Sequence, residues 1–230
     1  MKPLLIACLG FSLFLFLSVS SVPAQNSQPT PEELEAAKRA FRKLGGRLIK
    51  IPLEKQPVYC FILPTRTKDG DLKNVPAVSF AFGLDLANSK VTDAGLKELA
   101  NVKNVILLLL SETKVTDSGL KELANLKNLT SLGLGHTKVT DAGMKELANL
   151  KNLASLNLVA TNVTDAGLKE LAKLKNLTSL NLGGTKITDA GAKDIANLKK
   201  LASINVSGTE VSDVGEKDIR NALPKCVIFR

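Results

Sequence analysis

Apolar positions recur along most of the chain with a fixed period of 24 residues. In the copy at residues 153–176, Leu156 and Leu158 lie in a short segment where apolar and polar positions alternate, as in a β-strand. Apolar residues spaced three apart then mark the inner face of a short helix: Leu168, Leu171 and Leu174. Each copy therefore predicts one strand followed by one helix of about two turns.

An Asp-x-Gly pair marks every copy and keeps the same phase from Lys90 to Val214. The pairs are Asp93/Gly95, Asp117/Gly119, Asp141/Gly143, Asp165/Gly167, Asp189/Gly191 and Asp213/Gly215. A fixed period of this length is typical of a solenoid, in which each repeat packs only on its neighbours. We expect the aspartate column to lie at the helix starts, and we expect the glycines to leave room for close approach of adjacent turns.

This pattern over residues 81–215 resembles the leucine-rich repeat family, and in particular secreted bacterial members with TDAGLKEL phrases. The resemblance implies an α/β fold of the ribonuclease-inhibitor-like type. Such a fold is a right-handed solenoid with parallel strands on its concave face and short helices on its convex face. The family usually has Asn or Cys after the strand, whereas this chain has a hydroxyl column: Ser89, Thr113, Thr137, Thr161, Thr185 and Thr209.

The segments that flank the repeats predict two caps, at residues 31–80 and 216–230. Thr30, Pro31 and Glu33 are typical of a helix start, and strands are expected at residues 47–51 and 58–63. Glu216 stands in the column that Leu96, Leu120 and Leu168 occupy in earlier copies, and a carboxylate there is costly beneath a further repeat. We therefore expect the stack to close with a strand over residues 226–229.

The first 24 residues have the pattern of a signal peptide, with Lys2, an apolar run and small residues before Ala24. A polar tether, residues 25–30, follows. The alternatives are an uncleaved anchor, whose apolar run would be short for a span of about 20 residues, and a lipoprotein site at Cys8, which lies very early. The pattern predicts a secreted, periplasmic or cell-envelope protein with no stable membrane span after cleavage.

Two cysteines, Cys60 and Cys226, lie outside this signal segment. About seven strands at roughly 4.8 Å each separate them, so they are near 30 Å apart. A disulfide requires Cα atoms within about 7 Å. We therefore expect two unpaired, apolar fillers of the caps.

The formal net charge is +9, from 31 Lys and Arg against 22 Asp and Glu. One lysine column is followed throughout by an acidic residue: Lys97, Lys121, Lys145, Lys169, Lys193 and Lys217. This alternation, with few aromatics, favours a solvated face and no nucleic-acid partner. The pattern also predicts no cofactor, no metal site and no catalytic residue, and it places His136 in a loop.

One repeat departs from the small, polar character expected on the concave face. Residues 105–110 read VILLLL, which leaves apolar side chains without an inward role. The candidate partner contact is Phe82, Ile106, Leu107 and Leu109, because exposed apolar patches mark interaction sites. The alternative is that the N-terminal helix or tether covers these residues. If they are exposed, Leu107→Ser with Leu109→Ser should leave folding intact.

Together these features predict an exported, non-enzymatic scaffold for protein–protein interaction, a function that follows from the family resemblance. A structural or surface-coating envelope module without a defined ligand is the alternative. An enzyme is disfavoured, because a catalytic constellation is irregular and this chain is regular.

Overall fold

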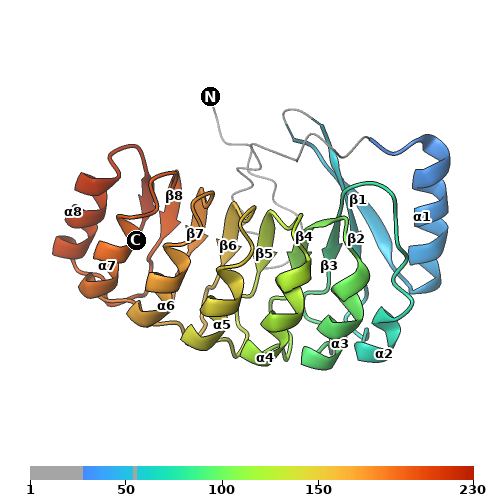
Figure 1. Ribbon diagram of the computed structural model, residues 1–230, viewed down its shortest axis with the longest axis horizontal. Coiled ribbons are helices and arrows are strands. Elements are labelled where there is room, and N and C mark those ends of the chain that lie inside the picture. Colours follow the sequence, from blue (N-terminus) through green and yellow to red (C-terminus); the bar gives the residue numbers. More distant parts are fainter. Residues whose placement is uncertain (1–27, 54–55) are drawn as a thin grey trace.

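The computed structural model describes residues 28–53 and 56–230, and these form one curved solenoid (Figure 1). The strands make a single sheet in sequence order, in which β1 and β2 are antiparallel and all later neighbours are parallel. The strands are β1 Arg47–Ile51, β2 Val58–Ile62, β3 Phe82–Asp85, β4 Val105–Leu109, β5 Ser131–Gly133, β6 Ser155–Asn157, β7 Ser179–Asn181, β8 Ser203–Asn205 and β9 Val227–Phe229.

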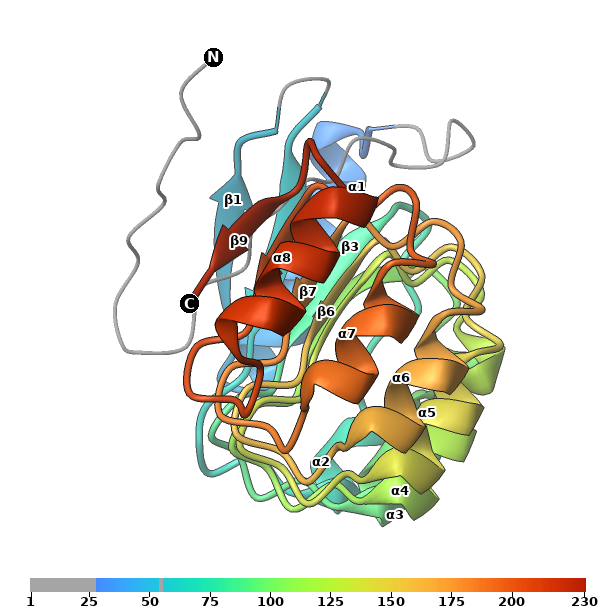
Figure 2. The ribbon, with the colours of Figure 1, turned by 90° about the vertical axis from the view of Figure 1, so that its left-hand side faces the viewer.

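The helices line the opposite side of the molecule from the sheet, as the end view shows (Figure 2). They are α1 Pro31–Lys43, α2 Asp69–Leu72, α3 Asp93–Glu98, α4 Asp117–Leu120, α5 Asp141–Leu147, α6 Asp165–Leu171, α7 Asp189–Ile195 and α8 Asp213–Ala222. Short 3-10 turns at Leu99–Asn101 and Lys121–Asn125 continue α3 and α4. The α/β solenoid expected from the repeat is confirmed.

The predicted signal segment, residues 1–24, lies outside the described residues. Within the described part, no helix combines the length and the apolar character needed to cross a bilayer.

Aliphatic side chains from strand and helix fill the space between the two layers. Leu132, Leu156 and Leu180 occupy paired positions on adjacent strands and are at most 1% exposed, as the repeat predicts. Full burial of a leucine contributes about 1.5–3 kcal/mol. Because each repeat buries its leucines against the next, the stack folds where a single repeat would not.

The aspartate column joins adjacent repeats. Asp141 accepts the backbone N–H of Thr164 at 2.8 Å and its hydroxyl at 2.7 Å. The same pair of bonds, at 2.6–2.9 Å, recurs at Asp69–Thr92, Asp93–Thr116, Asp117–Thr140, Asp165–Thr188 and Asp189–Ser212. The sequence placed the aspartate column at the helix starts. The structure assigns the cap to the hydroxyl residue and makes the aspartate a clamp between repeats.

The glycine of each Asp-x-Gly pair makes room for this clamp. A Cβ on Gly167 would lie 2.5 Å from Oδ1 of Asp141 in the preceding repeat. A Cβ on Gly191 would lie 2.2 Å from Oδ1 of Asp165. The expectation of close approach between adjacent turns is therefore confirmed, and it explains why the two residue types keep a common phase.

The hydroxyl column after the strands acts within its own repeat. Thr161 donates its hydroxyl to the carbonyl of Leu158 at 2.7 Å, and Thr137 bonds Leu134 in the same way at 2.6 Å. The hydroxyls thus satisfy buried carbonyls at the strand ends.

The turn residue directly before each hydroxyl residue adopts a left-handed backbone conformation, with positive φ. This column holds Asn88, Glu112, His136, Ala160, Gly184 and Gly208, with φ between +52° and +66°. His136 is exposed and lies in this turn, which agrees with its expected loop position.

The N-terminal cap closes the first repeat with aromatic packing. α1 begins at a capping box between Thr30 and Glu33, as predicted. The ring of Phe41 stacks on Phe61 with centroids 3.9 Å apart, and both rings meet Phe82 edge-on. The sequence did not predict α2, whose Asp69 extends the aspartate column into the cap.

The C-terminal cap ends the aspartate column with an ion-pair network. Asp213 has no following hydroxyl partner and instead pairs with Arg230. Arg230 also lies 3.5 Å from Glu216, which pairs with Arg220. Glu216 thus sits at the solvated end of the stack, consistent with its expected closing position.

Cys60 and Cys226 are buried and unpaired, as their separation predicts.

Candidate functional site on the concave face

Alternate strand residues point to the concave face. The chemistry of these residues divides the face into two halves. From β5 to β8 the outward positions form two polar columns across the sheet. They are Ser131, Ser155, Ser179 and Ser203 in one column, and Asn157, Asn181 and Asn205 in the other. At β9 the same columns change to Val227 and Phe229.

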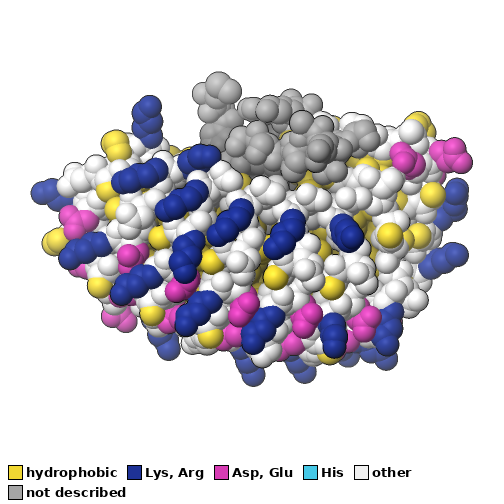
Figure 3. Space-filling view, viewed as in Figure 1, with side chains coloured by type: hydrophobic (Ala, Val, Ile, Leu, Met, Phe, Trp, Pro, Cys, Tyr) yellow, Lys and Arg dark blue, Asp and Glu magenta, His cyan; other side chains and the backbone are white. Residues whose placement is uncertain are grey.

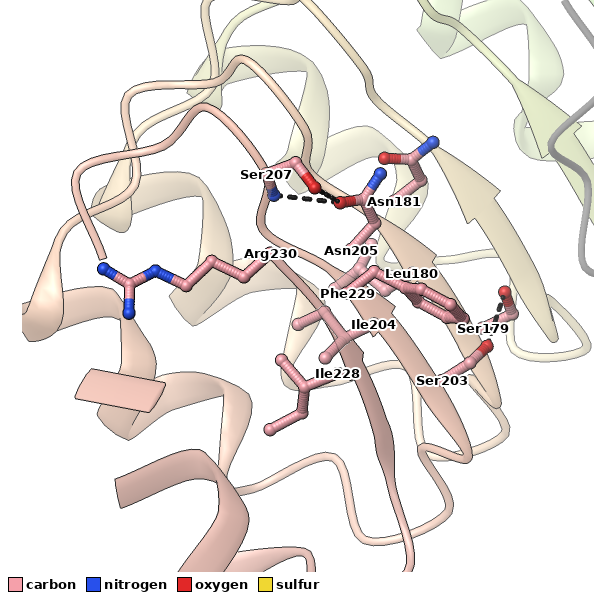
Figure 4. A pocket seen from close by; sticks show the side chains of 10 residues that line it. All are labelled: Ser179, Leu180, Asn181, Ser203, Ile204, Asn205, Ser207, Ile228, Phe229 and Arg230. Carbon is pink, nitrogen blue, oxygen red and sulfur yellow. Dashed lines mark hydrogen bonds between the residues drawn. The ribbon is translucent and has the colours of Figure 1, made fainter. Parts of the chain in front are cut away.

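A hollow of about 450 Å³ lies at the C-terminal end of this face (Figure 4). Its volume falls in the range of about 300–1,000 Å³ that is usual for ligand pockets. Uncharged hydroxyl and amide groups of β7 and β8 line it, next to the ring of Phe229 and to Arg230. The hydroxyls of Ser203 and Ser179 lie 3.2 Å apart and form a hydrogen bond.

The asparagine column has a fixed orientation. The side-chain oxygen of Asn181 accepts the N–H of Gly183 at 3.0 Å, and Asn157 makes the same turn with Val159. Asn205 accepts both the N–H and the hydroxyl of Ser207, at 2.9 and 2.6 Å. Because the oxygens are used in these turns, the amide groups present N–H donors to a ligand.

The N-terminal half of the concave face is apolar and closed. Cys60, Leu107 and Leu109 form a buried cluster against which Ile49, Ile51 and Ala87 pack. Gly83 lies between β2 and β4, and the side chains of Cys60 and Leu107 close over it. Burial raises the pKa of the Cys60 thiol far above its ordinary value, so this thiol is not a nucleophile at neutral pH.

The structure corrects the predicted exposure of the partner contact. Phe82 is 0% exposed and packs into the aromatic core. β3 is one residue shorter than β4, and the pairing shifts between Phe82 and Gly83, so that Phe82 pairs with the core residue Val105 and points inward. Ile106, Leu107 and Leu109 are 1%, 4% and 6% exposed. The strands of the N-terminal cap, rather than its helix, contact Leu107 and Leu109.

Asp85 is the acidic member of the asparagine column. Its side chain accepts the N–H of Ala87 at 2.9 Å, as the asparagines of later repeats do with their own turns. Burial raises the pKa of this carboxyl, although the Ala87 bond and the charge of Arg47 act in the opposite direction.

No group of three or more His, Cys, Asp or Glu side chains in residues 28–53 and 56–230 is arranged to hold a metal ion.

The leucine-rich repeat family model matches residues 125–148 and 173–196, in phase with the 24-residue period of the whole solenoid. The chain is a leucine-rich repeat protein. No curated protein matches this leucine-rich repeat protein significantly in sequence.

Solved structures share the fold of this leucine-rich repeat protein. Internalin C2 from Listeria monocytogenes aligns with TM-score 0.54 and 23% identity, over 91% of this chain and 98% of that one. An internalin (inlF) from the same organism gives TM-score 0.50 and 20% identity, over 69% of this chain and 49% of that one. A leucine-rich repeat protein from Leptospira interrogans gives 0.48 and 21%, over 74% and 52%. The chain thus spans about half the length of the last two.

Sequence reasoning missed the exposed apolar residues of the C-terminal half. Val227 and Phe229 are 55% and 37% exposed, next to the polar hollow. The closing strand was expected, but the sequence alone does not fix its register. Only the pairing of Ile204 with Ile228 shows that Ile228 points inward and its two neighbours outward.

Proposed function

We propose that this leucine-rich repeat protein is an exported, non-enzymatic scaffold that binds a protein partner on the C-terminal half of its concave face. One observation carries the proposal. Among the described residues, three large hydrophobic side chains are exposed, Val214, Val227 and Phe229, and two of them lie side by side on this face. A small apolar centre beside polar groups is the usual anatomy of a protein interface.

The chemistry next to this pair supports a protein partner. Phe229 adjoins a hollow lined by Ser and Asn side chains, so a partner residue can enter it and bond to amide or hydroxyl groups. Aromatic side chains are common centres of binding energy, especially when polar contacts surround them. The charge of Arg230 is balanced by Asp213 and Glu216, which leaves the hollow without an unpaired cation.

A pull-down with the mature protein tests the proposal. We expect capture of a protein at saturable levels, and we expect Val227→Ser with Phe229→Ala to abolish it. Val214→Ser is the matched control, because Val214 is 66% exposed but lies on α8. If both variants capture the partner as well as wild type does, the concave site is wrong.

A surface-coating module remains the alternative function, and the same experiment separates the two. A coating module should enrich nothing saturable, even with wild-type protein. The contact at Leu107 and Leu109 stays a prediction of its own. Since both leucines are buried, binding there would require the covering residues to move, and a partner would have to stabilise that open form.

Export is the part of the proposal that rests on residues 1–24. The expected mature chain begins at Gln25. Mass spectrometry of the protein recovered outside the cytoplasm of an expressing bacterium checks this, and an intact Met1 in that fraction would contradict it.

A further inference from the structure

A row of lysines runs along the edge of the solenoid where each helix returns to the next strand. We call this row the lysine edge, and its members are Lys103, Lys127, Lys151, Lys175, Lys199 and Lys200. All six are exposed. Rows of Lys and Arg along the length of the molecule are visible in Figure 3.

The lysine edge is held in place by side chains of the following repeats. Asn128 donates to the carbonyl of Lys103 at 3.1 Å, and Asn152 donates to that of Lys127 at 2.8 Å. Asn176 continues the series to Lys151 at 2.9 Å. These bonds hold the backbone of one lysine per repeat at a constant interval, so the exposed lysine side chains start from a regular line along the edge.

The charges of the lysine edge are not neutralised by ion pairs. Within the described residues, none of its six ammonium groups has a carboxylate within 4.0 Å. Lys151 and Lys175 donate to helix carbonyls at 2.5 and 2.7 Å, and Lys200 donates to the neutral Asn176. The lysines of the helix column that begins at Lys97 also form no ion pair within 4.0 Å among the described residues, but each is followed directly in sequence by Asp or Glu.

We propose that the lysine edge binds a linear polyanion that carries phosphate groups along a flexible backbone without bases. An ordered line of unpaired cations attracts such a chain and releases its counterions. Nucleic acid fits less well, because single-strand binders add aromatic side chains on which bases stack. The lysines of the edge and the asparagines beside them provide no aromatic side chain on which a base could stack.

The test uses the full chain and long-chain inorganic polyphosphate as the probe. Titration at rising salt should show affinity falling with salt concentration. We expect Lys127→Gln, Lys151→Gln and Lys175→Gln together to weaken binding at least about tenfold and to lower the salt slope by about 2–3.

The matched control is Lys121→Gln with Lys145→Gln and Lys169→Gln, which removes the same charge from the column with acidic neighbours. Its affinity should stay within about threefold of wild type, since each of these lysines adjoins an acidic residue in sequence whose charge offsets that of the cation. Equal losses in both triple variants would show that net charge alone binds the probe, and would overturn the proposal.

A second variant covers a possible loss of folding. Lys151 and Lys175 also bond to helix carbonyls, so Lys103→Gln with Lys199→Gln tests the edge through lysines that make no such bond. Unchanged binding in this variant, with an unchanged Tm, would contradict the proposal. Tighter binding of a single-stranded oligonucleotide than of polyphosphate would also overturn it, in favour of nucleic acid.

Discussion

The carboxylate of Asp141 accepts two hydrogen bonds from Thr164 of the next repeat, one from its N–H and one from its hydroxyl. The Thr164 hydroxyl in turn accepts the N–H of Ala166 at 3.3 Å and caps α6. One side chain therefore fixes the distance between repeats and the start of a helix together. This coupling explains why Thr, Asp and Gly recur as a unit.

Replacing Asp141 with Ala should destabilise the protein. The N–H and hydroxyl of Thr164 would lose their acceptor at a part-buried site, which costs about 1–3 kcal/mol for each unsatisfied group. Urea unfolding measures the loss. The control is Asp213→Ala, whose side chain is 93% exposed and clamps no following repeat, so its effect should be about 0.5 kcal/mol or less. Equal losses would refute the clamp.

Two glycines in helices should respond to alanine with opposite signs. Gly167→Ala places a Cβ against Asp141 Oδ1 and should cost about 1–3 kcal/mol through overpacking. Gly70 in α2 has nothing within 4 Å of a built Cβ, so Gly70→Ala should stabilise by about 0.5–1 kcal/mol. Thermal unfolding of both variants checks the pair, and a gain at Gly167 would contradict the close approach.

The left-handed residue Ala160 should be improved by glycine. Its φ is +52°, where the Cβ of an L-residue clashes with its own backbone at a cost of about 1–2 kcal/mol. The next two copies already have Gly184 and Gly208 there. We expect Ala160→Gly to raise stability by about 0.5–1 kcal/mol, whereas Ala166→Gly, in a regular turn of α6, should lower it. A loss at both sites would show that the φ of Ala160 carries no strain.

Asp85 should make stability depend on pH. Burial raises the folded pKa of Asp85, so ionisation of its carboxyl destabilises the fold. This cost is complete at pH values above the folded pKa and absent at pH values below the unfolded pKa of roughly 3.9. Asp85→Asn, which matches the later repeats, should stabilise by about 0.5–2 kcal/mol at neutral pH. The gain should shrink as pH falls through the folded pKa. Denaturant unfolding at several pH values tests this, and a constant gain would argue against it.

Asp189 provides the opposite sign. Hydrogen bonds from the Ser212 hydroxyl and N–H hold the pKa of Asp189 below its ordinary value. Its contribution to stability is therefore present above the unfolded pKa and lost as pH falls through the folded one. The loss in Asp189→Asn should accordingly be largest at neutral pH and fade in acid, in the same unfolding series.

The period of the sequence predicted the solenoid because every copy repeats the same contacts. Leu132, Leu156 and Leu180 needed only the phase of the leucines to be placed side by side. The role of Asp141 was harder to predict. Its partner lies in the next repeat, and from sequence alone an aspartate at the start of a helix can equally cap that helix. The clamp could be recognised only from distances across the repeat boundary.

The concave face was less predictable because it depends on the irregular ends of the chain. Gly83 has no side chain, and the strands of the cap place Cys60 beside Leu107 across it. No periodic rule gives that contact. Phe82 was misplaced because β3 lacks one residue relative to β4, which moves the register by a position that sequence spacing alone does not reveal.

The burial of Leu107 and Leu109 reverses the expectation that their replacement by serine leaves folding intact. With exposures of 4% and 6%, each truncation removes apolar contacts and leaves a void, at about 2–5 kcal/mol per leucine. The control uses the same two columns at the other end of the sheet. Val227 and Phe229 are aligned with Leu107 and Leu109 but are 55% and 37% exposed, so Val227→Ser with Phe229→Ser should shift the unfolding midpoint far less. If the leucine pair is as silent as the Val227 and Phe229 pair, the apolar half of the face is open in solution. The partner contact first predicted from the sequence would then regain its surface.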